Sequence, residues 1–156
     1  MATLHLMVGL PCAGKTTRAK LLEKELNALR LTPDEWQLRL FGQDAEAPEH
    51  DWRHDTIEDL MWRTAATVLG HGVDVILDYG FWKKIERDDY RARAAGIGAR
   101  CRIHLLDVAE DILLRRLDIR NETGDPTSFR MSRAQLSAWL SHFECPSSEE
   151  LEAFDA

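Results

Sequence analysis

Short apolar runs alternate with longer segments of helical periodicity along this chain. The runs that predict strands are residues 3–8, 28–32, 73–78 and 100–107. Between and after them lie segments whose apolar residues recur every three or four positions, over residues 17–29, 57–69, 83–95, 109–121 and 132–143. Because parallel strands need a crossover helix, this alternation predicts an α/β fold with a parallel sheet of about four or five strands.

The loop between the first strand and the first helix carries the most specific motif. Its sequence, Gly-Leu-Pro-Cys-Ala-Gly-Lys-Thr-Thr at residues 9–17, matches Gly-x-x-x-x-Gly-Lys-Ser/Thr at every fixed position. Glycines let such a loop turn backbone N–H groups toward a triphosphate, and the following helix adds the positive end of its dipole. We therefore predict that ATP and Mg²⁺ bind here, with Lys15 on the outer phosphates and Thr16 on the metal. The predicted nucleotide-binding residues of the loop are Gly9, Pro11, Cys12, Ala13, Gly14, Lys15, Thr16 and Thr17.

Length, charge and cysteine spacing narrow the possible functions. The 156 residues fit one domain, 1–156, and their net charge of −7 gives no general attraction to nucleic acid or to an anionic membrane. The first apolar run is too short to span a membrane and lacks the basic flank of a secretory signal, so a cytoplasmic protein is expected. No Cys-x-x-Cys pair occurs, and Cys12 is interpreted as a small residue that fits its loop, with a reactive thiol as the alternative.

Asp34 is the predicted catalytic base. The segment Thr32-Pro33-Asp34-Glu35 carries two helix-start signals, capping-box spacing and a proline at the first helical position. Asp34 thereby falls in a first helical turn just after the second predicted strand, at the sheet edge where ligands bind. A carboxylate there can accept the proton of an attacking hydroxyl, and a loose phosphoryl-transfer transition state asks more for orientation than for basicity. An ordinary first-turn acid is the alternative.

Three further residues are predicted on the substrate side beside Asp34. Asp78 ends the strand 73–78, where a carboxylate can hold Mg²⁺ beside the loop, and a strand-terminal turn residue is the alternative. Trp82 follows as a candidate wall of the substrate pocket, or else as a packing anchor. Arg53 is a candidate for facing the cleft, with an exposed position as the default. A metal site at the histidines of positions 50 and 54 is disfavoured, because no third ligand is evident.

A mobile lid is predicted over about residues 115–131. Arg116 and Arg120 lie four apart and therefore share one face of the predicted helix, ahead of a polar turn. Such a pair can close over ATP and neutralise the transferring phosphoryl group, and a salt-bridged surface face is the alternative. The acidic tail, residues 145–156, is expected to be loosely held, with Leu151 and Phe154 as docking points.

Taken in order, five motifs of this chain resemble those of the small P-loop kinases of the zeta-toxin and chloramphenicol-phosphotransferase type. They are the loop itself, Thr-Pro-Asp-Glu-Trp, Val-Ile-Leu-Asp-Tyr-Gly-Phe-Trp, Leu-Leu-Arg-Arg-Leu-Asp-Ile-Arg-Asn and Phe-Glu-Cys-Pro, and the resemblance runs from about residue 3 to about residue 146. It implies a three-layer P-loop NTPase fold with the nucleotide-kinase sheet order 2-3-1-4-5 and a helical lid over ATP.

By the same resemblance, Lys15 and Thr16 handle the outer phosphates and Mg²⁺, Asp34 activates the acceptor hydroxyl, and Arg116 and Arg120 are lid arginines. The chain departs from that family after its last predicted helix, because residues 150–156 are too short and acidic for a convincing fifth strand.

The function predicted from these features is an ATP- and Mg²⁺-dependent kinase that phosphorylates a hydroxyl of a small molecule, of the antibiotic, nucleoside or sugar-nucleotide type. A nucleic-acid 5′-hydroxyl kinase or a nucleotide kinase is the alternative within enzymes, and the acidic composition speaks against a nucleic-acid partner. A regulatory or non-catalytic nucleotide-binding module is the alternative outside them. A GTPase switch is unsupported, because neither Asn-Lys-x-Asp nor Asp-x-x-Gly follows the loop.

Overall fold

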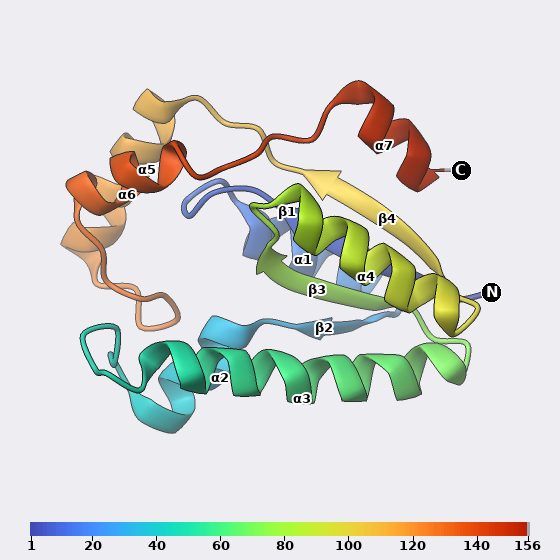
Figure 1. The fold of residues 1–156 in the computed structure, drawn as a ribbon. Helices are drawn as coiled ribbons and strands as arrows, with labels where there is room; N and C mark the ends of the chain where they lie inside the picture. Colours follow the sequence, from blue (N-terminus) through green and yellow to red (C-terminus); the bar gives the residue numbers. More distant parts are fainter. Residues whose placement is uncertain (156) are drawn as a thin grey trace.

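A four-stranded parallel sheet forms the centre of the protein, as the computed structural model of residues 1–155 shows (Figure 1). The strands are β1 (Thr3–Val8), β2 (Leu29–Leu31), β3 (Val75–Gly80) and β4 (Arg100–Leu105). Their spatial order is β2-β3-β1-β4, and every neighbouring pair is parallel. The four strands predicted from the apolar runs are thus confirmed, together with the first four positions of the predicted strand order.

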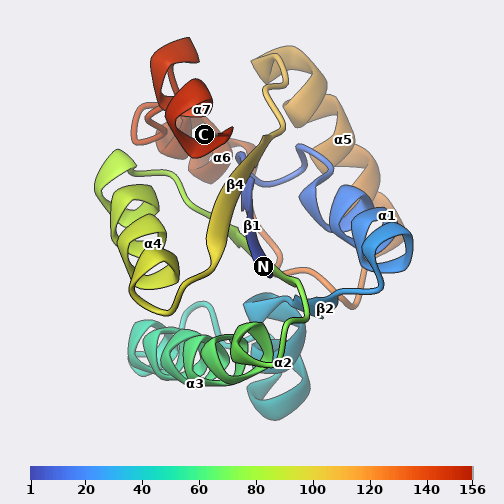
Figure 2. The ribbon, with the colours of Figure 1, turned by 90° about the vertical axis from the view of Figure 1, so that its right-hand side faces the viewer.

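Helices cover both faces of this sheet and make the fold three-layered (Figure 2). In chain order the helices are α1 (Lys15–Leu26), α2 (Pro33–Phe41), α3 (His50–Gly70), α4 (Lys84–Gly96), α5 (Glu110–Thr123), α6 (Arg133–Leu140) and α7 (Ser148–Asp155). Seen nearly along the strands, α1 and α5 lie on one side of the sheet, and α4 and α7 lie on the other. Within residues 1–155, no helix is both long and apolar enough to cross a membrane.

The alternation of side chains along the strands divides the core between the two faces. Leu4 and Leu6 of β1 pack in the larger core cluster with Met61 of α3. Met7, the residue after Leu6, points to the opposite face and packs with Ile76 of β3 and residues of α1. A third cluster joins the loop at residues 9–17 to α5 and α6. This third cluster anchors α5 and α6 to the loop at residues 9–17.

The C-terminal tail forms a docked helix, α7, in place of a fifth strand. Phe154 is buried in the larger core cluster, which agrees with its predicted docking role. Glu150 accepts hydrogen bonds from both Arg87 Nε (2.6 Å) and Arg87 Nη2 (3.0 Å), and both side chains are almost fully buried. The expectation of a loosely held tail is therefore wrong for residues 148–155. Its last position, 156, lies outside the described residues.

Helix α2 begins as predicted at Pro33, but without the capping box. The Thr32 side chain caps no backbone N–H of the helix, and its hydroxyl donates to Asp78 Oδ2 instead (3.1 Å). Glu35 binds Arg30, with 3.2 Å between Oε1 and Nη1. The two residues with capping-box spacing therefore stabilise the junction of β2, β3 and α2, because each has a stronger partner outside the helix end.

Candidate active site

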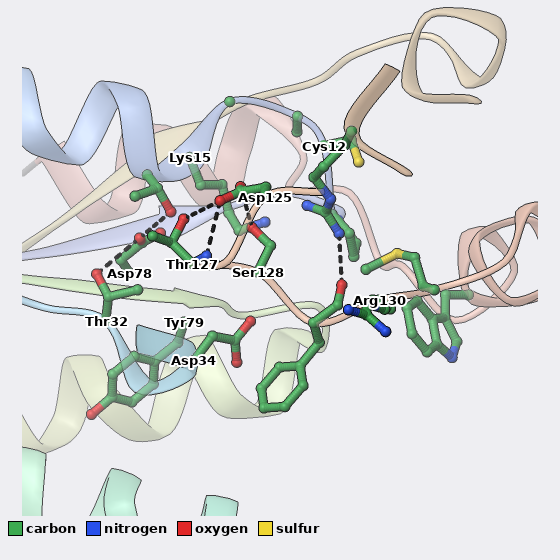
Figure 3. Close-up of a pocket in the computed structure, with 18 of the residues that line it drawn as sticks. Cys12, Lys15, Thr32, Asp34, Asp78, Tyr79, Asp125, Thr127, Ser128 and Arg130 are labelled. Atoms are coloured by element: carbon green, nitrogen blue, oxygen red, sulfur yellow. Dashed lines mark hydrogen bonds between the residues drawn. The ribbon is translucent and has the colours of Figure 1, made fainter. Parts of the chain in front are cut away.

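A cavity of about 940 Å³ opens at the carboxyl ends of the strands. This is the edge at which ligands bind in open parallel sheets. Its lining comes from the P-loop (residues 9–17) with α1 behind it, the end of β3 with Trp82, the starts of α2 and α3 with the loop between them, the helices α5 and α6, and the lid segment, residues 125–131. Figure 3 shows Lys15 and Asp34 on different walls of this cavity, with the lid segment beside them. The structure thus brings together most of the residues that the sequence selected.

The P-loop is curled as a phosphate-binding loop requires. Cys12 and Gly14 have positive φ angles, 67° and 94°, which is the backbone geometry that turns successive N–H groups into one concavity. Gly9 lies so close to the end of β4 that a Cβ there would sit 3.0 Å from the Leu106 carbonyl oxygen. Burial raises the pKa of the Cys12 thiol, although Arg120, Lys15 and Arg116 oppose the rise. This favours a neutral thiol and the interpretation of Cys12 as a loop residue.

Lys15 is folded back onto its own loop. Its Nζ donates to the Leu10 carbonyl oxygen at 2.8 Å, and the side chain lines the cavity. Burial lowers the pKa of Lys15, whereas Asp78 and Asp34 raise it. An ammonium group that is partly desolvated and held by one neutral carbonyl is well placed to exchange that carbonyl for a phosphate oxygen.

Asp78 and the Thr16 hydroxyl form a candidate magnesium site, and the Thr32 hydroxyl holds the Asp78 carboxylate in place. Asp78 Oδ2 accepts hydrogen bonds from Thr16 Oγ1 (2.6 Å) and Thr32 Oγ1 (3.1 Å). Asp78 Oδ1 is buried and has no hydrogen-bond partner among residues 1–155. Such an orphaned carboxylate oxygen fits a hard cation, and Mg²⁺ characteristically combines one or two protein oxygens with phosphates and waters. The residues present therefore fit the predicted metal.

The Asp34 carboxylate faces the cavity from the first turn of α2 (Figure 3). The side chain is open to solvent within the cavity, while the surrounding walls still desolvate it and raise the pKa of the carboxyl group. His54 and Lys15 act in the opposite direction and favour the ionised form, whereas Asp78 adds to the rise. Asp34 is thus neither buried in the core nor turned away from the P-loop.

Both predicted lid arginines line the cavity: Arg116 joins α5 to the P-loop, and Arg120 joins α5 to the lid segment. Arg116 Nη1 donates to the Cys12 carbonyl oxygen, and Arg120 Nη2 donates to the Phe129 carbonyl oxygen, each at 3.1 Å. Asp125 shapes the turn of the lid segment, because it accepts hydrogen bonds from Thr127 and Ser128. The guanidinium groups are therefore positioned beside the nucleotide-binding loop.

The lid segment also contacts the opposite wall of the cavity. Gln43, in the loop between α2 and α3, donates through Nε2 to the Ser128 carbonyl oxygen and accepts at Oε1 from the Arg130 backbone N–H, each at 3.0 Å. The Phe129 ring meets the His50 ring edge-on, with 5.1 Å between centroids. A single amide side chain thus pairs with the lid backbone at two points and bridges the mouth of the cavity.

The remaining predicted residues have other surroundings. Trp82 lines the cavity, but its Nε1 donates to the Gly9 carbonyl oxygen at 3.1 Å, so it supports the P-loop as well. Gly9 itself lies outside the cavity lining. Arg53 also lies outside it: its guanidinium binds Asp44 Oδ2 at 3.1 Å and stacks on the Phe41 ring at 4.2 Å. We therefore do not retain Arg53 as a substrate-binding residue.

Several residues of the site were not selected from the sequence. Thr32 and Gln43 make long-range hydrogen bonds that no local pattern announces. His50 and His54 line the cavity and were weighed only as metal ligands. Across residues 1–155, no group of three or more His, Cys, Asp or Glu side chains is arranged to hold a metal ion. In the sequence, the one signal for His50 and His54 was their spacing of four residues, which places both on the same face of a helix.

Comparison with known proteins agrees with this architecture. A protein from Chloroflexus aurantiacus described as a candidate kinase shares 21% identity over 94% of this chain and 82% of its own, with a TM-score of 0.75. Kti12 of Chaetomium thermophilum, solved with ADP-AlF3, shares 22% over 94% and 82%, with a TM-score of 0.69. A gluconokinase of Sinorhizobium meliloti shares 18% over 96% and 78%, with a TM-score of 0.56. At these identities the likeness establishes the fold alone.

The family assignment comes from the sequence itself. No curated protein sequence matches the chain significantly. The model of the AAA_33 family, an AAA domain, matches residues 4–146, which include the P-loop, Asp34, Asp78 and both lid arginines. Because that match spans most of the chain, the protein belongs to the AAA_33 family of AAA domains.

Proposed function

We propose that this protein is an ATP- and Mg²⁺-dependent kinase that transfers the γ-phosphoryl group to a hydroxyl of a small molecule. The observation that carries the proposal is the single cavity that has Lys15 on one wall and Asp34 on another. Phosphoryl transfer needs an acceptor placed in line with the terminal phosphate and charge neutralisation around it; Asp34 would provide the first and Lys15 part of the second.

The division of labour within the cavity follows from the contacts. Lys15 and the P-loop backbone would hold the outer phosphates, while Thr16 and Asp78 would hold Mg²⁺, which when bound neutralises phosphate charge. Arg116 and Arg120 extend the positive side of the cavity along the lid. Asp34 would orient the acceptor hydroxyl and accept its proton as the new phosphate ester forms.

Two kinds of support concern the identity of the kinase. The motifs of the chain resemble those of zeta-toxin and chloramphenicol-phosphotransferase type kinases, and we include membership of that group in the proposal. Known structures of similar fold include a gluconokinase, whose name refers to a small hydroxyl-bearing substrate. Fold likeness does not fix the acceptor, because acceptor contacts come from loops and lids that vary between proteins of one fold.

The test is a search for phosphorylated product by mass spectrometry. The protein is incubated with Mg-ATP and a panel of antibiotics, sugars, nucleosides and nucleotides, together with an oligonucleotide that bears a 5′-hydroxyl. We expect one small molecule to gain a phosphoryl group, and Asp34→Asn to abolish that product while ATP still binds. Phosphorylation of the oligonucleotide alone would favour the nucleic-acid alternative. Nucleotide binding with no product from any acceptor would favour a non-catalytic nucleotide-binding module.

A further inference from the structure

The floor of the acceptor side is a chain of hydrogen bonds between α2 and α3, centred on Gln37. This side chain is fully buried, and its Nε2 lies 3.2 Å from each carboxylate oxygen of Asp44 and 3.1 Å from the His50 carbonyl oxygen. Asp44 is itself buried and also receives Arg53 Nη1 at 3.1 Å and His50 Nδ1 at 2.8 Å. Gln37 Nε2 and Arg53 Nη1 can only donate, and His50 Nδ1, which also lies 3.0 Å from Gln37 Nε2, donates to Asp44 when it carries the ring proton. This surrounding suits an ionised carboxylate.

This environment fixes which way the Gln37 amide points. Turned over, the amide would place its oxygen 3.2 Å from both Asp44 oxygens, an arrangement of acceptors with no proton between them. The amide nitrogen therefore faces Asp44. The amide oxygen, Oε1, then faces His54 Nδ1 at 3.1 Å.

The other ring nitrogen of His54 also faces an acceptor. Nε2 lies 2.9 Å from Glu58 Oε1, one helical turn further along α3. A neutral imidazole carries one N–H only, so one of these two contacts would bring an acceptor against a bare lone pair. With Glu58 as a carboxylate, both hydrogen bonds form only when both ring nitrogens carry a proton. The geometry thus requires the cationic form of His54.

The charges around His54 act in the same direction as the hydrogen bonds. Burial opposes protonation, but Glu58, Asp34 and Asp55 outweigh it, so the pKa of His54 lies above its ordinary value of 6.5. His50 stacks beside it, with 6.3 Å between ring centroids. The charges that act on Asp34 are those of His54 and Lys15, which favour its ionised form together with His50, and that of the acid Asp78, which opposes it.

We infer that His54 is an imidazolium ion in the folded protein and serves as a positioning residue, which acts through Asp34 by keeping that carboxylate ionised. His54 has no free N–H for a substrate, because Gln37 and Glu58 take both. Its effect on the reaction therefore passes through charge. The catalytic part of this inference rests on the proposed kinase function, whereas the charge state of His54 does not.

The charge state is measured by NMR on the isotope-labelled full-length protein, from the imidazole nitrogen shifts of His54 against pH. The His54 signal is assigned by its loss in His54→Gln. We expect both nitrogens to be protonated near neutral pH, with a pKa above 6.5. One protonated and one bare nitrogen near neutral pH would overturn the inference.

Two variants test the partners that hold the charge. Glu58→Gln keeps an acceptor but removes the negative charge, and we expect the pKa of His54 to fall by about 1 unit. Asp34→Asn should lower it by about 0.5 unit, because the coupling between two charges is reciprocal. Asp59→Asn is the matched control: it removes an acid from the neighbouring, exposed position of α3, where Asp59 binds Arg63, and should leave His54 unchanged. If Asp34→Asn leaves the pKa of His54 unchanged, the coupling between His54 and Asp34 is contradicted.

The effect on the reaction is measured as phosphate release from Mg-ATP, with water in place of the acceptor. We expect His54→Gln to slow release about tenfold and to move the acidic limb of the pH profile upward, since loss of the cation favours protonated Asp34. His54→Lys should restore part of the rate because it keeps the charge. If His54→Gln does not fold, Glu58→Gln should move the limb in the same direction. If NMR shows His54 to be an imidazolium ion but His54→Gln leaves the pH profile of phosphate release unchanged, the positioning role is overturned. The kinase proposal would remain intact.

Discussion

The two halves of the cavity are built in opposite ways. The nucleotide half comes from one stretch, the P-loop, which includes Lys15 and Thr16, with Asp78 beside it. Its polar groups are held loosely: Lys15 has a backbone carbonyl as partner, and Asp78 Oδ1 has none among residues 1–155. The acceptor half is gathered from α2, α3 and their connecting loop, and its polar groups are saturated by one another through Gln37 and Asp44.

This difference indicates what each half is for. A half whose polar atoms lack strong partners is completed by a ligand, since a buried polar group without a partner is costly. A half whose hydrogen bonds are already made is a rigid support that orients one open group, Asp34. We therefore expect substitutions in the nucleotide half to affect ATP directly, and those in the acceptor half to affect turnover.

Lys15→Ala should have the largest effect. We expect phosphate release from Mg-ATP to fall about a thousandfold, because the variant lacks the P-loop ammonium group that stabilises the negative charge developing on the leaving phosphates. The fold should be intact by circular dichroism, since Lys15 lies in the cavity and its one hydrogen bond is to its own loop. Lys20→Ala, on an exposed position of α1, is the control. Full activity of Lys15→Ala would reject the P-loop assignment.

Asp34→Asn should follow, with a fall in turnover of about a hundredfold or more, as expected for loss of a general base. ATP affinity, measured by isothermal titration calorimetry, should stay close to that of the wild type because Asp34 lies across the cavity from the P-loop. Glu35→Gln, in the same helical turn but directed at Arg30, is the matched control. Lost ATP binding with normal turnover at saturating ATP would remove Asp34 as the base.

Arg116→Ala and Arg120→Ala should each lower kcat by about tenfold to a hundredfold, and more than they weaken ATP binding. The reason is that charge neutralisation is needed most while the phosphoryl group is in transfer. Arg115→Ala removes a neighbouring exposed arginine that does not line the cavity. Equal losses in Arg115→Ala and Arg116→Ala would show that only the overall charge of α5 matters.

Gln43→Ala should have a smaller effect, at the contact that joins the lid to the acceptor half. Loss of two solvent-exposed hydrogen bonds to the lid backbone, together worth about 1 kcal/mol, should raise the apparent KM for the acceptor about fivefold. Gln43→Glu tests the geometry, because a carboxylate keeps the bond from the Arg130 N–H and loses the one to Ser128. An unchanged KM in both variants would mean that the bridge plays no part in closure.

Glu150→Gln should affect turnover least, and serves to separate stability from chemistry. We expect a loss of about 3 kcal/mol in the free energy of unfolding, measured with urea, because the almost fully buried Arg87 loses its ionic partner. Activity of the folded protein at low temperature should be retained, since neither Glu150 nor Arg87 lines the cavity. Glu149→Gln, at the adjacent exposed position, should be neutral. A stable but inactive Glu150→Gln would link the tail to the reaction.

The sequence by itself determined the α/β class, the four strands and the nucleotide half of the cavity. Each of these depends on local signals: apolar spacing sets the type of element, and a nine-residue loop needs only its own glycines, Lys15 and the next helix to bind phosphate. Asp34 was also found locally, because a helix start after a strand fixes where its side chain lies.

Tertiary structure decided the rest. The chain Glu58–His54–Gln37–Asp44, the engagement of Arg53 with Asp44 and the bridge from Gln43 to the lid all join residues of different elements or loops. Likewise, the tail became a docked helix because Arg87 offered Glu150 a buried ionic partner and the larger core cluster took in Phe154. The spacing of residues along a chain encodes the period of an element, but the partner of a buried polar group is chosen only when elements pack and water is excluded.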